Sequence, residues 1–169
     1  RAHADLFEVL TDPDALIRHY LLSRDDIDLI RTRRRAENLL GVAVHICLLR
    51  YPGFGWSDGI MPPAELIAWL AEQLQVEACT LDDYAIRRNT RHEHHALAMR
   101  HLGLSPFGPE HVQQAEDIAT MATFATDHGV KIVETLVAEL RKQHLVLPSV
   151  DTLERLALKG RARARREAA

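Results

Sequence analysis

The segment from residue 36 to residue 51 is apolar on almost every side when it is placed on a helix. A helix that is hydrophobic all round is buried, and the uninterrupted apolar run, near Leu39 to Leu49, is far shorter than the roughly 20 residues of a membrane span. We therefore predict a central core helix against which the rest of the chain packs. Its apolar side chains are Leu39, Leu40, Val42, Val44, Ile46, Leu48 and Leu49.

The rest of the chain repeats the amphipathic period of helices, with no convincing strand alternation. Pro13 lies in the first turn of one helical segment, and Ser23 with Asp26 caps the next, which runs to about Arg35. Further segments lie at 63–74, from Thr80, at 110–127, at 130–144 and from Ser149. We predict an all-α fold of about eight helices in one or two compact subdomains with helix-turn-helix-like units.

Glycine and proline gather between residues 52 and 63, which predicts an irregular loop between two parts of the chain. After this loop, short turns join three helices, and the third has a basic start, as in a helix-turn-helix unit. We expect an N-terminal helical subdomain with the central helix at 1–55, the three-helix unit at 62–104, C-terminal helices at 105–158 and a basic linker or tail at 159–169.

The positive charges gather in three clusters, although the 169 residues carry a formal net charge of −3. Because no overall basic excess exists, any nucleic-acid surface has to be local. Cys47 and Cys79 form no Cys-x-x-Cys pattern, which favours a reduced, cytosolic protein. The clusters are Arg31, Arg33, Arg34 and Arg35; Arg87, Arg88 and Arg91; and Lys159, Arg161, Arg163, Arg165 and Arg166.

The stretch from Tyr84 to Leu102 joins two short helices by a tight break and concentrates basic, amide and imidazole groups there. We expect Thr90 to cap the second helix and Glu93 to complete a capping box. A helix N-terminus attracts phosphate, and arginines there can reach phosphates or guanine edges. The groups crowded at this start are Arg87, Arg88, Asn89, Arg91 and His92.

The histidines of this helix raise the alternative of a metal site. His94 and His101 share one stripe with Leu97 and Ala98, so we assign both to the core with hydrogen-bond partners. No cysteine pair or His-Glu-x-x-His spacing supports zinc, and we expect no metal or cofactor in this chain. A small metal-dependent enzyme ranks lowest among the alternatives. The outward faces would carry Arg91, His92, His95 and Met99.

Three passages resemble the N-terminal region of replicative transposases of the Tn-three family, in order and in spacing. They are RRRAENLLGVAVHICLLRYPG at 33–53, YAIRRNTRHEH at 84–94 and HLVLPSVDTLERL at 144–156. Together they cover nearly the whole chain. The matching positions include Arg34, Asn38, Leu40, Gly41, Ala43, Tyr84, Arg87, Asn89, Thr90, Arg91, Glu93, His94, Leu147, Pro148, Thr152 and Leu153.

The resemblance implies a DNA-binding region that recognises the terminal inverted repeats of a transposon. In this family the catalytic domain is a separate RNase H-like fold with an acidic triad and divalent metal, so we expect no enzyme activity in this chain. The implied partners are the double-stranded DNA of the transposon ends, the remainder of the transposase and a second copy in a full-length homodimer, with no membrane. The implied location is the bacterial cytoplasm, in association with the nucleoid.

On this reading, the helix beginning at Thr90 enters a major groove of the DNA. The base edges would be read by Asn89, Arg91, His92 and His95. Phosphates would be held by Arg33, Arg34, Arg35, Arg87 and Arg88, and further contacts would come from Asn38, Arg161 and Arg163.

Several alternatives stay open at this point. An arginine before a buried helix often bonds backbone carbonyls, which applies to Arg34, and an asparagine such as Asn38 can cap a helix. The basic tail after Gly160 can be a merely solvated helix end. The whole chain can also be an all-helical assembly module of a transposase without direct sequence readout.

Overall fold

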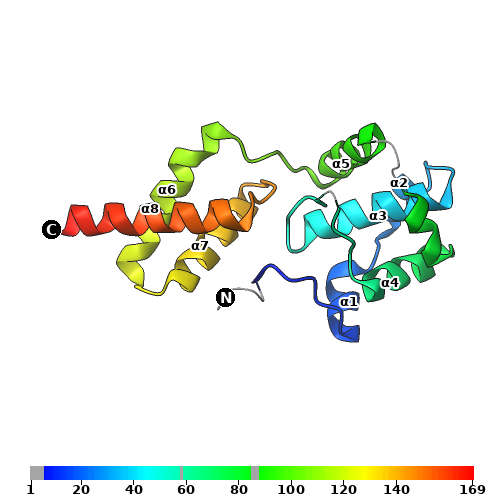
Figure 1. Cartoon of the computed structure of the whole chain (residues 1–169), viewed down its shortest axis with the longest axis horizontal. Helices are drawn as coiled ribbons and strands as arrows, with labels where there is room; N and C mark the ends of the chain where they lie inside the picture. The colour runs from blue at the N-terminus through cyan, green and yellow to red at the C-terminus, as the bar shows by residue number, and fades with distance from the viewer. Residues whose placement is uncertain (1–5, 58, 85–87) are drawn as a thin grey trace. The chain divides into compact units, whose positions relative to one another are not determined.

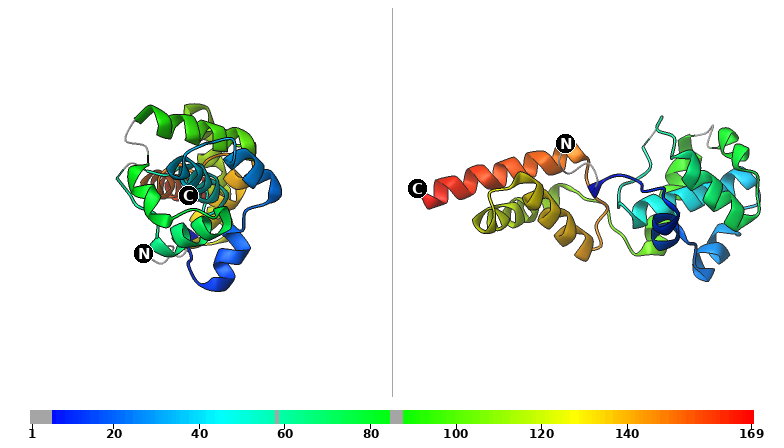
Figure 2. Two further views of the ribbon diagram at one scale, coloured as in Figure 1. Left: turned by 90° about the vertical axis from the view of Figure 1, so that its right-hand side faces the viewer. Right: turned by 90° about the horizontal axis from the view of Figure 1, so that it is seen from below.

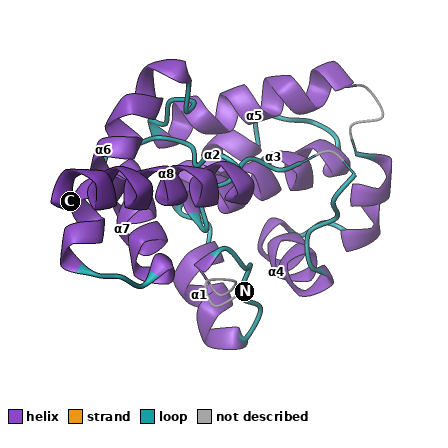
Figure 3. Ribbon diagram, turned by 60° about the vertical axis from the view of Figure 1, so that its left-hand side comes forward, coloured by secondary structure: helices purple, strands orange, loops and turns teal. Residues whose placement is uncertain are grey.

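The computed structural model describes residues 6–57, 59–84 and 88–169 (Figure 1). Across these ranges the elements are eight α-helices and the 3-10 helix η2, joined by loops (Figure 3), and the one isolated β-bridge pairs Ser105 with Leu145. The predicted all-α class is confirmed. Two compact units are present: residues 9–103, and residues 104–169 together with the short segment 6–8.

The central element of the unit 9–103 is α3 (Ala36–Arg50), as the sequence predicted. Its residues are buried from Leu39 to Cys47 and again at Leu49. Burying one large aliphatic side chain contributes about 1.5–3 kcal/mol, so α3 is the main apolar contribution to this unit. The elements that pack against it are α1 (Pro13–Tyr20), α2 (Arg24–Ile30), α4 (Ala64–Leu74), η2 (Ala78–Asp83) and α5 (Arg88–Leu102).

The start of α2 is fixed by the capping box that the sequence predicted. The hydroxyl of Ser23 accepts the N–H of Asp26 at 3.0 Å, and the carboxylate of Asp26 accepts the N–H of Ser23 at 2.9 Å. The predicted length was wrong, because α2 ends at Ile30 and not near Arg35. The hydroxyl of Thr32 donates to a carbonyl of the last turn at 2.6 Å, which competes with continuation of the helix.

The carboxylate of Asp26 also joins α2 to α3 and α5. It accepts two hydrogen bonds from the guanidinium of Arg50, at 2.8 and 2.9 Å, and one from Nε2 of His101 at 2.7 Å. Only 1% of Asp26 is exposed. Burial acts to raise the pKa of Asp26, but the hydrogen bonds from Arg50, His101 and the backbone of Ser23 hold it well below its usual range. The ionised carboxylate is therefore a structural group.

The unit 104–169 is formed by α6 (Pro109–Ala125), α7 (Gly129–Lys142) and α8 (Val150–Ala168), and each of these helices packs on the other two. The connection before α8 is pinned by hydrogen bonds from Ser105 N–H to the carbonyl of His144 and from Val146 N–H to the carbonyl of Ser105, both 2.9 Å long. The fully buried side chains of this core include Ile132, Leu136, Leu140 and Leu153.

The basic segment after Gly160 is the end of a helix, which was one of the alternatives, and not a separate tail, because α8 continues to Ala168. Gly160 and Ala164 are buried, and a Cβ at Gly160 would lie 2.5 Å from Cβ of Ala119 and 2.7 Å from the backbone nitrogen of Thr120. Small residues one turn apart thus let the backbones of α6 and α8 approach closely. The sequence did not predict this helix contact, because the arginines around Gly160 and Ala164 made the segment look like a solvated one.

The Asp26→Asn variant should lower the free energy of unfolding by about 2–4 kcal/mol near neutral pH, because it leaves Arg50 without its anionic partner. The folded pKa of Asp26 lies below its unfolded value of about 3.9, so its contribution is present above that pH and is lost as the pH falls. Urea unfolding between pH 7 and pH 3 should show the difference between the two proteins shrinking.

The control is Asp28→Asn, which changes an exposed carboxylate of the same helix and should alter stability by less than about 0.5 kcal/mol. An equal loss for both variants, or a difference independent of pH, would contradict the structural role of Asp26.

The Gly160→Ala variant should destabilise the unit 104–169, although alanine favours a helix over glycine by about 1 kcal/mol. The added methyl would meet the backbone of α6, and overpacking costs about 1–3 kcal/mol. Gly129→Ala is the matched control, since a Cβ there would lie 3.7 Å from Arg161 Nη1, an ordinary contact. Urea unfolding should show a loss only for Gly160→Ala, and the reverse order would contradict the close packing of α6 on α8.

Candidate nucleic-acid interface

The helices α3 and α5 run side by side in the same direction, so both begin at the same end of the unit 9–103 (Figures 1 and 2). Their C-terminal turns meet where Arg50 and His101 bind Asp26. Nearer their starts, Tyr84 covers Gly41 of α3 and bonds His94 of α5. The arginine-rich segment before α3 and the start of α5 are therefore neighbours.

Tyr84 is the residue that seats the first half of α5 on α3. Its hydroxyl lies 2.7 Å from Nδ1 of the buried His94. Its ring occupies the space that a side chain at position 41 would take, which only glycine leaves free. Burial, followed by the nearby charge of Arg33, lowers the pKa of His94. The predicted core role is thus confirmed for His94, with Tyr84 as its partner, whereas His101 has its predicted partner in Asp26 but is only half-buried.

His45 lies beneath this contact, in the middle of α3. Its ring centre is 5.1 Å from that of Trp56 and 5.9 Å from that of His95, and neither of its ring nitrogens has a hydrogen-bond partner. Burial, with the charges of His95 and Arg91, lowers the pKa of His45 to about 3. The ring is neutral at physiological pH and acts as an aromatic core residue.

Arg91 connects α5 to the loop 52–63. Its guanidinium carbon lies 4.4 Å from the centre of the Trp56 ring, and Nη2 donates to the carbonyls of Trp56 and Ser57, both at 3.4 Å. The indole N–H of Trp56 donates to the carbonyl of Ile60 at 2.6 Å. A cation over an indole contributes about 0.5–2 kcal/mol of stability. This contact and the two hydrogen bonds from Arg91 hold the loop against α5.

Most of the sequence-predicted contact residues lie at the end of the unit where α3 and α5 begin. Arg33 is half-buried and influences His94, which belongs to α5. Asn38 is half-buried in the first turn of α3, so the capping alternative for it is wrong, because the N-cap position is Arg35. Arg87 lies outside the described residues. The exposed members are Arg34, Arg35, Arg88, Asn89 and His92.

Two predictions about α5 were wrong. Thr90 is not the N-cap, because α5 already begins at Arg88 and Thr90 is its third residue. His95 does not point to solvent, since it is half-buried with Cε1 at 3.0 Å from where a side chain at Gly55 would begin. The loop that covers His95 is distant in the sequence, which explains why the periodicity of α5 alone misplaced it.

The third basic cluster lies on α8 and is partly neutralised by α6. Arg163 donates to Asp117 at 2.6 Å and to Glu167 at 2.8 Å, and Lys159 lies 3.5 Å from Glu116. Arg161 is half-buried. Arg161 and Arg163 belong to the unit 104–169, whereas the other predicted contact residues belong to the unit 9–103.

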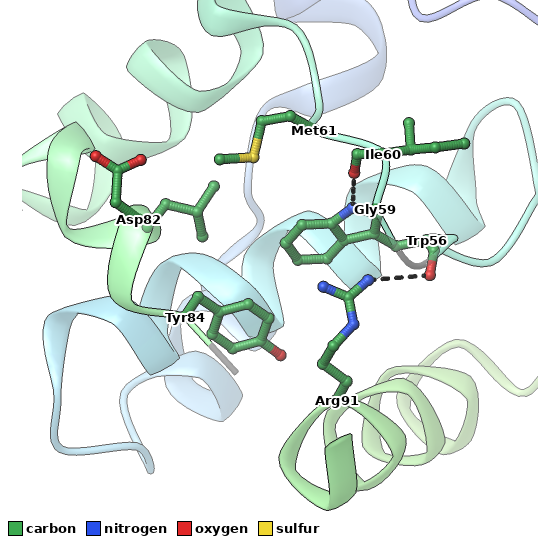
Figure 4. Close-up of a pocket in the computed structure, with 8 residues that line it drawn as sticks. Trp56, Gly59, Ile60, Met61, Asp82, Tyr84 and Arg91 are labelled. Atoms are coloured by element: carbon green, nitrogen blue, oxygen red, sulfur yellow. Dashed lines mark hydrogen bonds between the residues drawn. The ribbon is translucent and has the colours of Figure 1, made fainter. Parts of the chain in front are cut away.

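The sequence reasoning missed a pocket beside the start of α5 (Figure 4). Its volume is about 280 Å³, and its lining includes Trp56, Ile60, Met61, Leu81, Tyr84 and Arg91. The sequence signal for this pocket was Trp56, followed by the apolar Ile60 and Met61, in a loop rich in glycine and proline.

Across residues 6–57, 59–84 and 88–169, no group of three or more His, Cys, Asp or Glu side chains is arranged to hold a metal ion. No helix in the described part of the chain is long and apolar enough to cross a bilayer.

Comparison with known proteins gives a consistent set of relatives. Residues 1–160 match the family described as "Domain of unknown function (DUF4158)". The chain is 37% identical over 155 residues to the transposase for transposon Tn3926 of Escherichia coli, a match that covers 90% of this chain and 16% of the transposase. The transposase for transposon Tn501 of Pseudomonas aeruginosa is 35% identical over 153 residues, with the same coverage.

A more distant relative is the transposase for transposon Tn1546 of Enterococcus faecium, which is 27% identical over 149 residues and matches over 15% of its length. The chain thus spans about one-sixth of the length of these transposases. The resemblance to transposases that the sequence predicted is confirmed.

Replacing the hydroxyl of Tyr84 tests how α5 is seated. The Tyr84→Phe variant should lose about 1–2 kcal/mol of unfolding free energy, because it leaves a buried nitrogen of His94 unsatisfied while the ring stays over Gly41. The control is a double-mutant cycle with His94→Leu, measured by urea unfolding. The double variant should lose less than the sum of the single losses, and simple additivity would contradict the coupling of Tyr84 to His94.

Proposed function

The chain belongs to the family described as "Domain of unknown function (DUF4158)", and from this premise we propose that it is a DNA-binding region of a transposase. Its role is to recognise the terminal inverted repeats of the transposon before the ends are paired and cut. The relatives named above are transposases, and the chain matches about 16% of their length. DNA cleavage and the divalent metal that it needs are assigned to the remainder of the protein.

The observation that carries this proposal is the basic end of the unit 9–103, where α3 and α5 both begin. Arg31, Arg34 and Arg35 precede α3, and Arg88 opens α5, all of them exposed. Free amides at two helix starts add to the attraction for phosphate, and arginine side chains can release counterions from DNA. A local basic surface of this kind is compatible with the formal net charge of −3 of the whole chain.

The exposed ridge of α5 is the proposed reading surface. Asn89 and His92 lie on it and are exposed, whereas His95 of the same helix is covered by the loop. An asparagine can bond an adenine edge with both amide atoms, and each good pair of this kind contributes about 1–3 kcal/mol of discrimination. Arg91 and His95 are held against the loop and stay predicted contacts at the edge of this surface.

A second candidate function is an assembly module that joins transposase subunits. Met121 and Phe124 favour it, because these large apolar side chains of α6 are 68% and 55% exposed and lie three residues apart. The predicted homodimer of the full-length protein would use such a face. The proposed DNA-binding role in the bacterial nucleoid does not depend on it.

Titration by fluorescence anisotropy tests the main proposal. The chain should bind a duplex with the inverted repeat of its own element more tightly than a shuffled duplex, and affinity should fall steeply with salt. Arg34→Ala and Arg35→Ala should each lower the salt slope by about 1, and Asn89→Ala should reduce the preference for the repeat by about 1–3 kcal/mol. These side chains are exposed, so the melting temperature should not change.

Arg24→Ala is the matched control, since Arg24 is also exposed but lies at the start of α2, beside the end of α3. Its salt slope should equal that of the unchanged protein. Equal affinity for both duplexes would leave only nonspecific phosphate contact, and an absence of DNA binding together with self-association would favour the assembly module.

A further inference from the structure

The pocket beside the start of α5 lies between the loop 52–63, η2 and Arg91 (Figure 4). We propose that this pocket receives one unstacked nucleobase of the DNA that α5 binds. The inference rests on the function proposed above, because the base would come from a duplex that the basic end of the unit already holds.

One wall of the pocket is aromatic and cationic. The rings of Trp56 and Tyr84 stack on each other, with centres 5.3 Å apart and planes inclined by 7°, and Tyr84 also stacks on His94. Tyr84 therefore supports this wall from behind, and the half-buried Trp56 with the guanidinium of Arg91 over its ring is the part that a base would meet. Proteins that bind unpaired bases combine aromatic rings and arginine in this way, because every base offers a π-face. A cationic guanidinium next to an aromatic wall also suits the phosphate attached to such a base.

The opposite wall is apolar and unusually exposed. Ile60 is 64% exposed and Met61 is 56% exposed, and Figure 4 shows the thioether of Met61 directed across the pocket toward η2. The Trp56 indole donates its 2.6 Å hydrogen bond to the backbone carbonyl of Ile60, which ties this part of the loop to the aromatic wall. Isoleucine and methionine are among the side chains that proteins insert at unstacked base steps.

The pocket also has a suitable place and size. Arg91 and His95 of α5 face the loop, and Asn89 and His92 in the first turns of the same helix are exposed. A duplex on this exposed ridge would pass the mouth of the pocket. Its volume of about 280 Å³ lies just below the range of roughly 300–1,000 Å³ typical of pockets for drug-sized ligands, which leaves room for one base.

The experiment compares inverted-repeat duplexes that differ in one base pair at a time. At each position the partner of one base is replaced by an abasic site, which removes the energy needed to unpair that base. At one or two positions the chain should bind the abasic duplex at least about tenfold more tightly than the intact repeat. Anisotropy measures both affinities for each protein, so their ratio is internally controlled.

The Met61→Glu variant should lose this tenfold preference, because a carboxylate would enter the apolar wall of the pocket. Met121→Glu is the control, since it introduces the same charge at an exposed methionine of α6 and should keep the preference. Loss of the preference in Met61→Glu alone would support the proposal.

Three results would overturn it. Binding of the intact repeat without a preferred abasic position, or with a preference that Met61→Glu retains, would remove the base pocket and leave the DNA-binding function intact. A quench of Trp56 fluorescence by free deoxynucleoside monophosphates, with no abasic preference, would identify a free nucleotide as the ligand. A chain that binds no duplex at all would remove both the proposed function and the pocket.

Discussion

The arrangement of the unit 9–103 depends on one buried carboxylate. Asp26 closes the start of α2, receives the guanidinium of Arg50 at the end of α3 and receives His101 at the end of α5. A buried carboxylate stays stable only while its hydrogen-bond donors, here the Ser23 amide, the Arg50 guanidinium and the His101 ring, keep their positions. The ends of α3 and α5 are therefore fixed relative to each other. Because these helices run in the same direction, fixing their ends also fixes where they begin. The basic end of the unit is therefore held together by the Asp26 contact at the opposite end and by the Tyr84 contact nearer the helix starts.

The sequence predicted those features that neighbouring residues determine. The apolar surround of α3 and the capping box of Ser23 were readable because each depends on residues within one or two turns. The inward position of His94 and His101 followed from their shared helical stripe. Their partners could not be predicted, because Tyr84 and Asp26 are 10 and 75 residues away from them.

The wrong predictions also concern features that depend on residues distant in the sequence. Thr90 and Glu93 form a valid capping pattern, but Arg88 and Asn89 already belong to α5. Gly160 suggests a helix end when only its propensity is considered, whereas contact with Ala119 makes glycine the residue that fits. In the candidate site, the exposed arginines could be predicted from the sequence. The contact of Arg91 with Trp56 and the pocket beside it could not, because both depend on the loop 52–63, which has no helical periodicity.

The contact between Gly41 and Tyr84 has a consequence for how relatives of this chain can diverge. The two positions are 43 residues apart along the chain, yet the ring at one occupies the space that a methyl would need at the other. A substitution at position 41 is therefore accepted only together with a smaller side chain at position 84, and each change alone passes through a poorly packed intermediate. Across an alignment, these two columns should vary jointly, and a glycine should accompany every tyrosine.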